Sequence, residues 1–206
     1  MVRAMKFNIM NTQPLIEESD RLQSQRLILR QWQTSDLPYF AKLNNDPKVM
    51  AFFPAPLKEG QSNQLAQRLA DLIDQKGWGF WALELAQTGE FIGFVGLNSI
   101  DKDSAIPNAP FVEIGWRISS EHWGKGYAPE AAKLALSYAF EILTLDAVYA
   151  FTSLLNQPSQ RVMQKIFMRN TEQDFDHPKL VEGHRLRRHC LYKIDMNDWR
   201  IKNTLN

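Results

Sequence analysis

A six-residue segment near the middle of the chain constrains the fold more than any other feature. It consists of Trp123, Gly124, Lys125, Gly126, Tyr127 and Ala128. The apolar run before it, residues 111–118, predicts a strand, and the apolar run from Pro129 onward predicts a helix that begins with proline. Two glycines permit a tight turn and a close approach of a ligand to the backbone. Because a helix N-terminus presents unpaired N–H groups and partial positive charge, the segment predicts a pocket for a phosphate-bearing ligand.

Two common nucleotide-binding motifs do not fit this segment. The dinucleotide fingerprint Gly-x-Gly-x-x-Gly/Ala needs glycine or alanine where Pro129 stands. It also needs an acidic residue at the end of the next strand, whereas Asp146 precedes that strand. The phosphate loop of NTPases is absent from the sequence. A glycine pair here also fits a strand-to-helix turn that binds nothing, and that alternative stays open.

The composition limits the class of protein. A chain of 206 residues suits one domain or at most two small ones, and 44% apolar residues are enough for a substantial core. Lys plus Arg numbers 24 and Asp plus Glu 23, a balance that gives no electrostatic surface for nucleic acid or membrane. There is no apolar stretch for a membrane span or signal peptide, and the single Cys190 cannot form an internal disulfide. We therefore expect one cytoplasmic domain over residues 1–206, with residues 1–20 as an N-terminal extension.

Hydrophobic periodicity predicts one sheet with helices packed on it. We expect strands at residues 25–32, 80–85, 90–97, 111–118, 147–152, 171–175 and 189–194, and helices at residues 37–43, 61–75, 129–143 and 158–168. Ser35 and Asp36 predict the N-cap of the first helix. This order is typical of a mixed α/β or α+β domain with a single sheet.

Three motifs, in order, resemble the GCN5-related N-acetyltransferases (GNAT). They are residues 112–118 (Val-Glu-Ile-Gly-Trp-Arg-Ile), residues 123–131 (Trp-Gly-Lys-Gly-Tyr-Ala-Pro-Glu-Ala) and Asn156-x-x-Ser159. Within that family the chain is most similar to the ribosomal-protein alanine and serine acetyltransferase branch. The resemblance covers roughly residues 22–196. It implies a mixed, mostly antiparallel sheet that splays between the fourth and fifth strands, is flanked by helices, and holds acetyl-CoA.

The resemblance also implies the residues that hold acetyl-CoA. The backbone N–H groups of the turn would bind its pyrophosphate, with donors among Trp123, Gly124, Lys125, Gly126, Tyr127 and Ala128. Lys125 would add charge there, or else it is a solvated turn lysine. The N–H of Ile118 would polarise the thioester carbonyl. Asn156, and more weakly Ser159, would contact the cofactor, although Asn156 would equally well cap the next helix.

The chemistry that the resemblance implies is direct attack of a neutral primary amine on the thioester in a ternary complex. Glu113 is the best candidate for the base that takes the amine proton. Because Glu113, Gly115 and Arg117 share one face of a strand, a Glu113–Arg117 ion pair is the competing interpretation. The tyrosine that many relatives carry seven residues after the asparagine is Met163 here, so no acid is assigned. Phe167 replaces the glycine that usually ends this helix, so we expect a distorted turn or a longer helix.

A polar cluster near the C-terminus contains three of the four histidines. Its chemistry-bearing side chains include those of His177, His184, His189 and Cys190. The resemblance implies a loop between the last two strands that helps shape the acceptor site. His177 and His184 are candidate proton acceptors, and the sequence does not choose between them. A polar loop tied by Asp–His and Asp–Arg contacts is the main alternative. The spacing matches no standard zinc pattern, and adjacent His189 and Cys190 would point to opposite faces of a strand, so we expect no metal and no Cys–His nucleophile.

The acceptor stays open between a protein N-terminus and a small-molecule amine such as a drug or polyamine. The near-neutral charge mildly disfavours a surface for a basic ribosomal protein. Met163 and Phe167 favour the alternative of a CoA-binding module or sensor without efficient turnover. We expect a monomer or a homodimer with no nucleic-acid or membrane partner.

Overall fold

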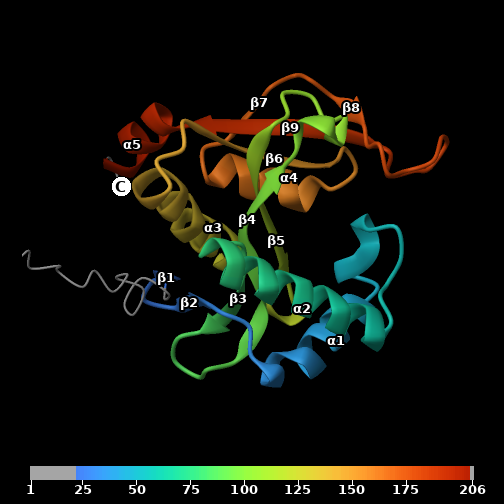
Figure 1. Ribbon diagram of the computed structural model, residues 1–206, viewed down its shortest axis with the longest axis vertical. Coiled ribbons are helices and arrows are strands. Elements are labelled where there is room, and N and C mark those ends of the chain that lie inside the picture. Colours follow the sequence, from blue (N-terminus) through green and yellow to red (C-terminus); the bar gives the residue numbers. More distant parts are fainter. Residues whose placement is uncertain (1–21, 205–206) are drawn as a thin grey trace, which may run out of the picture.

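The structure is a computed structural model that describes residues 22–204, so the extension expected at residues 1–20 lies outside the described residues. The strands are β1 (Leu22–Gln23), β2 (Leu27–Arg30), β3 (Phe80–Leu85), β4 (Phe91–Ile100), β5 (Phe111–Ile118), β6 (Ala147–Ser153), β7 (Arg169–Asn170), β8 (Phe175–Asp176) and β9 (Arg188–Asp195). They form one sheet in the order β1-β2-β3-β4-β5-β6-β9-β7, and β8 also pairs with β9 (Figure 1). Every pairing is antiparallel except that of β5 with β6, which confirms the mixed, mostly antiparallel sheet.

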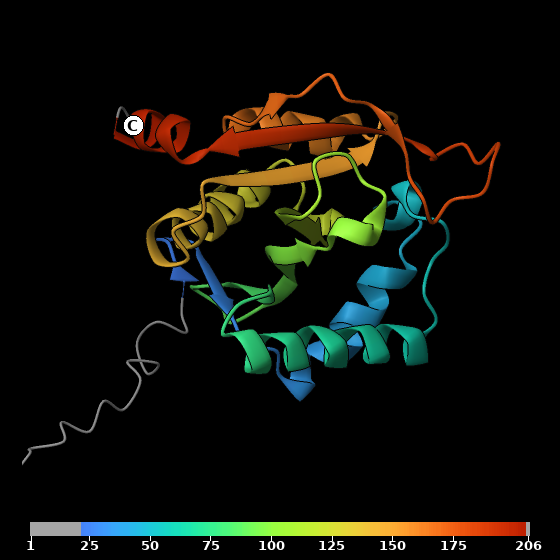
Figure 2. The same ribbon diagram turned by 45° about the horizontal axis from the view of Figure 1, so that its top comes forward.

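Helices cover both faces of this sheet (Figure 2). They are α1 (Leu37–Asn45), α2 (Glu59–Lys76), α3 (Tyr127–Ser137), α4 (Gln157–Lys165) and α5 (Met196–Thr204). Alternation along β3 separates the two cores, because Ala82 packs with α1 and α2 whereas Trp81 and Leu83 pack with α3. Fully buried alanines such as Ala131 and Ala135 let the α3 backbone lie close to the sheet. In the described part of the chain no helix is long and apolar enough to cross a membrane.

The sheet opens between β5 and β6. β4 and β5 pair continuously from Gly93↔Ile118 to Ile100↔Phe111, whereas β5 and β6 share one bridged pair, Glu113↔Tyr149. Beyond that pair the two strands diverge toward the ends at Ile118 and Ser153. These are the fourth and fifth strands of the sequence-based expectation, so the predicted splay is confirmed.

Several element boundaries differ from the sequence-based expectation. α3 begins at Tyr127, so Pro129 is its third residue, where a missing N–H is tolerated because first-turn N–H groups have no partner within the helix. The chain then continues through a π-helical turn, Tyr138–Ile142. The strand expected at residues 171–175 is absent; β7 and β8 flank a turn in which Glu172 has φ +60°. α5 was not predicted, although Trp199 is buried and stacks on Phe140.

Asp36 occupies the expected N-cap position but does not cap α1. Its carboxylate instead accepts two hydrogen bonds of 2.8 Å from the guanidinium of Arg30 and one of 2.8 Å from the N–H of Gln33. Arg30 also binds Glu84 on β3 at 2.5 Å. Asp36 therefore anchors the start of α1 to the sheet through its buried ion pair with Arg30, and not by capping the helix.

Phe167 adopts the left-handed conformation, although it stands where relatives carry glycine. Its φ is +67°, and α4 ends in a Schellman motif. In that motif the N–H of Phe167 donates to the carbonyl of Gln164, and the N–H of Met168 donates to that of Met163. The expectation of a distorted turn or a longer helix was therefore wrong. Burial of Met168 against the core that contains Met163 holds the chain in the conformation that glycine usually provides.

A pair of substitutions isolates the backbone strain at this position. Phe167→Ala and Phe167→Gly lose the same ring, but alanine keeps a Cβ at positive φ, so we expect the glycine variant to be more stable by about 1 kcal/mol in urea unfolding. In the control, exposed Arg68 inside α2, the order reverses and alanine is favoured by about 1 kcal/mol. Equal or greater stability of Phe167→Ala would argue against strain at this residue.

Candidate active site

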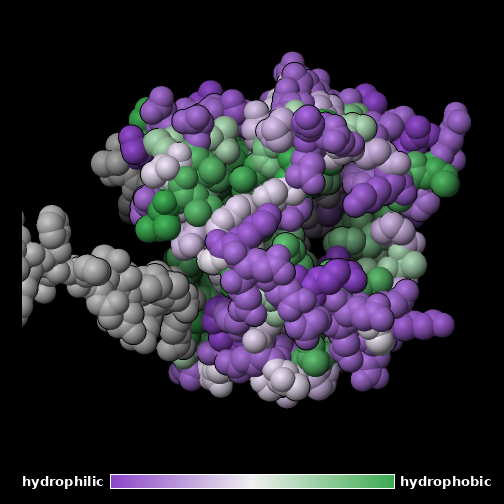
Figure 3. Space-filling view, in the orientation of Figure 1, coloured by the Kyte–Doolittle hydropathy of each residue, from purple (hydrophilic) through white to green (hydrophobic). Residues whose placement is uncertain are grey.

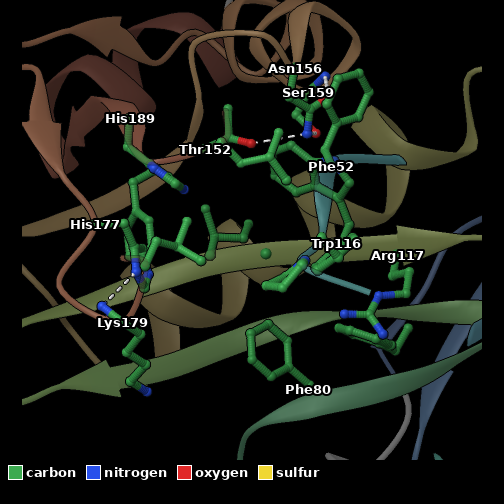
Figure 4. A pocket seen from close by; sticks show the side chains of 18 of the residues that line it. Phe52, Phe80, Trp116, Arg117, Thr152, Asn156, Ser159, His177, Lys179 and His189 are labelled. Atoms are coloured by element: carbon green, nitrogen blue, oxygen red, sulfur yellow. Dashed lines mark hydrogen bonds between the residues drawn. The ribbon is translucent and has the colours of Figure 1, made fainter. Parts of the chain in front are cut away.

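A cavity of about 450 Å³ lies where β5 and β6 diverge. Figure 3 shows the surface hollowed between the part that carries α1 and α2 and the part that carries β6 and β9. The walls of the cavity come from β5, β6, α2, α4, the connector at residues 52–54 and the loop after β8. Phenylalanines supply much of the surface: Phe52, Phe53, Phe80, Phe94 and Phe151. The close-up in Figure 4 shows polar side chains spaced around this apolar interior.

Asn156 and Ser159 line the cavity at the start of α4. Asn156 is the N-cap of that helix, because its Oδ1 accepts the N–H of Ser159 at 3.2 Å. Its Nδ2 donates to Thr152 Oγ1 at 2.9 Å and to Ser159 Oγ at 3.0 Å (Figure 4). The capping interpretation of Asn156 is therefore confirmed, and the same contacts fix its amide beside the cavity.

The glycine turn follows the end of β5, and none of its residues is among the described residues that line this cavity. Gly124 and Gly126 have φ +78° and +82°, so each position requires a residue that tolerates the left-handed region. The backbone N–H of Trp123 donates to the carbonyl of Ser120, and its indole Nε1 donates to the carbonyl of Ile118 at 2.9 Å. Within the described residues, no acceptor pairs with the next five backbone donors, those of Gly124, Lys125, Gly126, Tyr127 and Ala128.

An ion pair that the sequence analysis missed supports the turn. Arg26 reaches across from the β1–β2 loop, hydrogen bonds to Glu130 in the first turn of α3, and donates to the carbonyl of Lys125 at 3.1 Å. Burial acts to raise the pKa of Glu130, but hydrogen bonds from Arg26 and Ser24 outweigh it and hold that pKa below its usual value. The negative charge beside the helix start is thereby compensated. Because the partners are 104 residues apart in sequence, no local pattern indicates the contact.

The N–H of Ile118 points into the gap between β5 and β6. Ser119 donates its N–H to Ile92 on β4 at 2.9 Å. Since consecutive N–H groups of a strand point to opposite sides, the N–H of Ile118 faces away from β4. The carbonyl of Ile118 accepts the hydrogen bond from the indole of Trp123. One free backbone donor therefore lies at the open end of the splay.

Glu113 lies near the closed end of the splay and is partly buried. Burial raises the pKa of its carboxyl to about 7, against a hydrogen bond of 2.9 Å from Asn98 and the charge of Lys179. In the described part of the chain it forms no ion pair with Arg117. Four residues of strand separate the two by about 13 Å, and Arg117 instead donates to Asn44. The competing ion-pair interpretation was therefore wrong.

Gly115, between these two residues on the same face, lines the cavity and has the ring of Phe80 packed against it. A Cβ there would lie 3.1 Å from the ring of Phe80, so any side chain would displace that wall. The pairing of β4 with β5 runs through Gly96↔Gly115 without a shift in register.

His177 and His189 line the cavity from the C-terminal segment, whereas His184 and Cys190 do not line it. The rings of His177 and His189 lie 4.8 Å apart at an angle of 44°, and burial lowers the pKa of His177 to about 4. His189 faces the cavity while adjacent Cys190 is fully buried in the core, as strand alternation predicts. Among the described residues, no three His, Cys, Asp or Glu side chains converge on a metal-sized space. Asp176 pairs with Arg187 and Arg188, so the loop is also tied by ion pairs.

The chain belongs to the GNAT acetyltransferases, because the model of the acetyltransferase (GNAT) domain matches residues 26–169, more than half of its length. The uncharacterized protein YkkB of Bacillus subtilis is 33% identical over 151 residues, which cover 72% of this chain and 84% of that protein. Spermidine N(1)-acetyltransferase of Escherichia coli K12 is 29% identical over 160 residues, 75% of this chain and 78% of that protein.

Solved structures show the same fold at 24% identity or less. A GNAT-family acetyltransferase from Bacillus anthracis has a TM-score of 0.71 at 24% identity, over 86% of this chain and 99% of that one. The spermidine N-acetyltransferase of Vibrio cholerae, in complex with CoA and spermine, has a TM-score of 0.67 at 24% identity, over 86% and 99%. A proposed ribosomal-protein-serine acetyltransferase from Vibrio cholerae has a TM-score of 0.68 at 18% identity, over 85% and 97%. The family resemblance found in the sequence is confirmed.

The raised pKa of Glu113 makes stability depend on pH. The carboxyl of Glu113 has a pKa of about 7 in the folded state and 4.5 in the unfolded state. Between these pH values the folded state binds more protons than the unfolded state, so the free energy of unfolding falls as the pH rises. Glu113→Gln removes this effect. We expect the variant to gain about 2 to 3 kcal/mol relative to the parent between about pH 4.5 and pH 8 in urea unfolding. Glu182→Gln in an exposed loop is the control; a pH-independent difference for Glu113→Gln would contradict the buried, protonated carboxyl.

Proposed function

We propose that this protein transfers the acetyl group of acetyl-CoA to a primary amine by direct attack in a ternary complex. The observation that carries the proposal is the turn of five consecutive unpaired N–H groups at the start of α3, placed beside the open gap between β5 and β6. A diphosphate needs such donors, and an extended thiol-bearing arm needs such a gap. The CoA bound to the Vibrio cholerae relative supports the choice of cofactor.

The residues of this chain fit acetyl-CoA in two further respects. Gly124 has nothing within 4 Å of where a Cβ would stand, so the backbone there is open to a ligand. The unused N–H of Ile118 would donate to the carbonyl oxygen of the thioester and stabilise the negative charge that develops on it. Acetyl-CoA supplies the activated acetyl group when bound. Asn156 and Ser159 hold the start of α4 at the same gap, where we place the arm of the cofactor.

Glu113 is the proposed base, and it would act through water, because it does not line the cavity and five residues of strand, about 16 Å, separate it from Ile118. A carboxylate whose pKa is about 7 accepts a proton from an amine more readily than one with an ordinary pKa, because it is matched to the working pH. His177 stays a secondary candidate: it lines the cavity, but with a pKa of about 4 it is a weaker base. The apolar walls favour the neutral form of an acceptor amine, which is the form that attacks.

A module that binds CoA without efficient turnover is the second candidate. Its supporting observation is Met163, which is buried, lines the cavity from α4 and provides no proton donor. Release of free thiol from acetyl-CoA in the presence of a broad panel of amines separates an enzyme from a module, because a module releases none.

Substitution at Gly126 tests the cofactor site. In Gly126→Glu a carboxylate enters the place assigned to the pyrophosphate, so we expect acetyl-CoA affinity in calorimetry to fall about 100-fold, equivalent to about 2.7 kcal/mol. Gly183→Glu is the control, because Gly183 also has positive φ but lies in the loop before β9; a Cβ there would have nothing within 4 Å, and one at Gly126 would have Arg26 Nη2 at 3.6 Å. Parental affinity in Gly126→Glu, or no binding by the parent at tens of micromolar, would refute the assignment.

The pH dependence of the rate tests the base. We expect kcat to rise through pH 7, because Glu113 must lose its proton before it can accept one from the amine. Glu113→Gln should lower kcat by about 100-fold or more and remove that rise. His177→Gln should retain it. A rise that survives in Glu113→Gln would transfer the role of base to another group.

A further inference from the structure

Arg117 carries a partly buried charge that has no carboxylate partner among the described residues, and it lines the cavity. Its guanidinium lies over the ring of Phe53 at 4.0 Å and donates through one terminal nitrogen to Asn44 Oδ1 at 2.5 Å. Its Nε is buried and has no acceptor among the described residues. Burial lowers the pKa of Arg117 to about 10, with no neighbouring acid to oppose the shift.

The charges around the cavity have one sign. Among the described residues that line it, Arg117 and Lys179 are charged and none is acidic. In Figure 4 these two cations lie on opposite sides of the apolar interior. Exposed Lys179 acts on Glu113, whose pKa its charge lowers, so Arg117 is the cation left uncompensated. A polyamine would bring several positive charges into this field, which like-charge repulsion disfavours.

The unpaired Nε of Arg117 indicates which kind of ligand would compensate its charge. A guanidinium binds a carboxylate side-on through Nε and a terminal nitrogen, forming two parallel hydrogen bonds. An unpaired buried Nε costs free energy that such a ligand recovers. We propose that the acceptor is an amine that also carries a carboxylate and an apolar or aromatic body, with the carboxylate on Arg117 and the body against the phenylalanine walls. This inference rests on the proposed acetyltransferase function and names its substrate class.

The test compares amino acids with their amides, which lack the carboxylate. Leucine, phenylalanine and tryptophan are each paired with their amides, with spermidine as the cationic comparison. Binding is measured by calorimetry in the presence of CoA, and turnover by thiol release per neutral amine. We expect at least one carboxylate to be preferred over its amide by about 30-fold, and spermidine to be a poor ligand. The inference is overturned if every pair is bound equally or if spermidine is bound best.

Variants locate the effect on one side chain. We expect Arg117→Gln to abolish the preference for the carboxylate while leaving affinity for the amide and for acetyl-CoA within about threefold, and Arg117→Lys to retain part of it. Arg161→Gln removes the same charge from an exposed position of α4 that does not line the cavity and is the matched control, with little effect. Equal losses for acid and amide in a folded Arg117→Gln would reduce Arg117 to a structural role. If no amine releases thiol, the proposed function fails, whereas a carboxylate preference in binding would still uphold the site.

Discussion

The single bridged pair between β5 and β6 is the constraint on which the site depends. If the two strands paired along their full length, the N–H of Ile118 would be consumed by β6 and the cavity would close. Their divergence leaves backbone donors of β5 without a strand partner, and such groups need water or a ligand. The fold tolerates this because β5 is held along its other edge by eight paired residues of β4, and β6 is held by β9.

The carboxylate of Glu130 lies beside the glycine turn, and a contact with Arg26, which is distant in sequence, compensates its charge. An acid in the first turn favours a helix, and Glu130 occupies that position in α3. The same charge would repel a diphosphate at the N–H groups of the turn. Arg26 and Ser24 hydrogen bond to the carboxylate, so the helix keeps its acid while the anion site loses the repulsion. Arg26 also holds the carbonyl of Lys125, which fixes the turn itself.

Local patterns predicted the elements but not the contacts between distant ones. The β3–β4 hairpin, α2 and β5 follow from periodicity and turn residues, and the splay followed from the family resemblance. The conformation of Phe167 was missed because the surrounding core, rather than local preference, decides it. α5 was missed because Trp199 is its one deeply buried side chain, too little for a helical pattern. The ion-pair interpretation of Glu113 failed because a shared strand face does not place residues four apart in contact.

Burial shifts the pKa values of Glu113 and Arg117 in opposite directions. Burial penalises the charged form of each, so it raises the pKa of the carboxyl and lowers that of the guanidinium. Had they been neighbours, each would have neutralised the other, and neither would be available to a ligand. Four residues of strand keep them apart, with Gly115 and the ring of Phe80 between them. The carboxyl is thus able to exchange a proton near neutral pH, whereas the guanidinium, which stays charged there, attracts an anion. Because about 13 Å of strand separates them, an acceptor whose carboxylate lies on Arg117 reaches Glu113 directly only if its amine is at the other end of its apolar body, and otherwise through water.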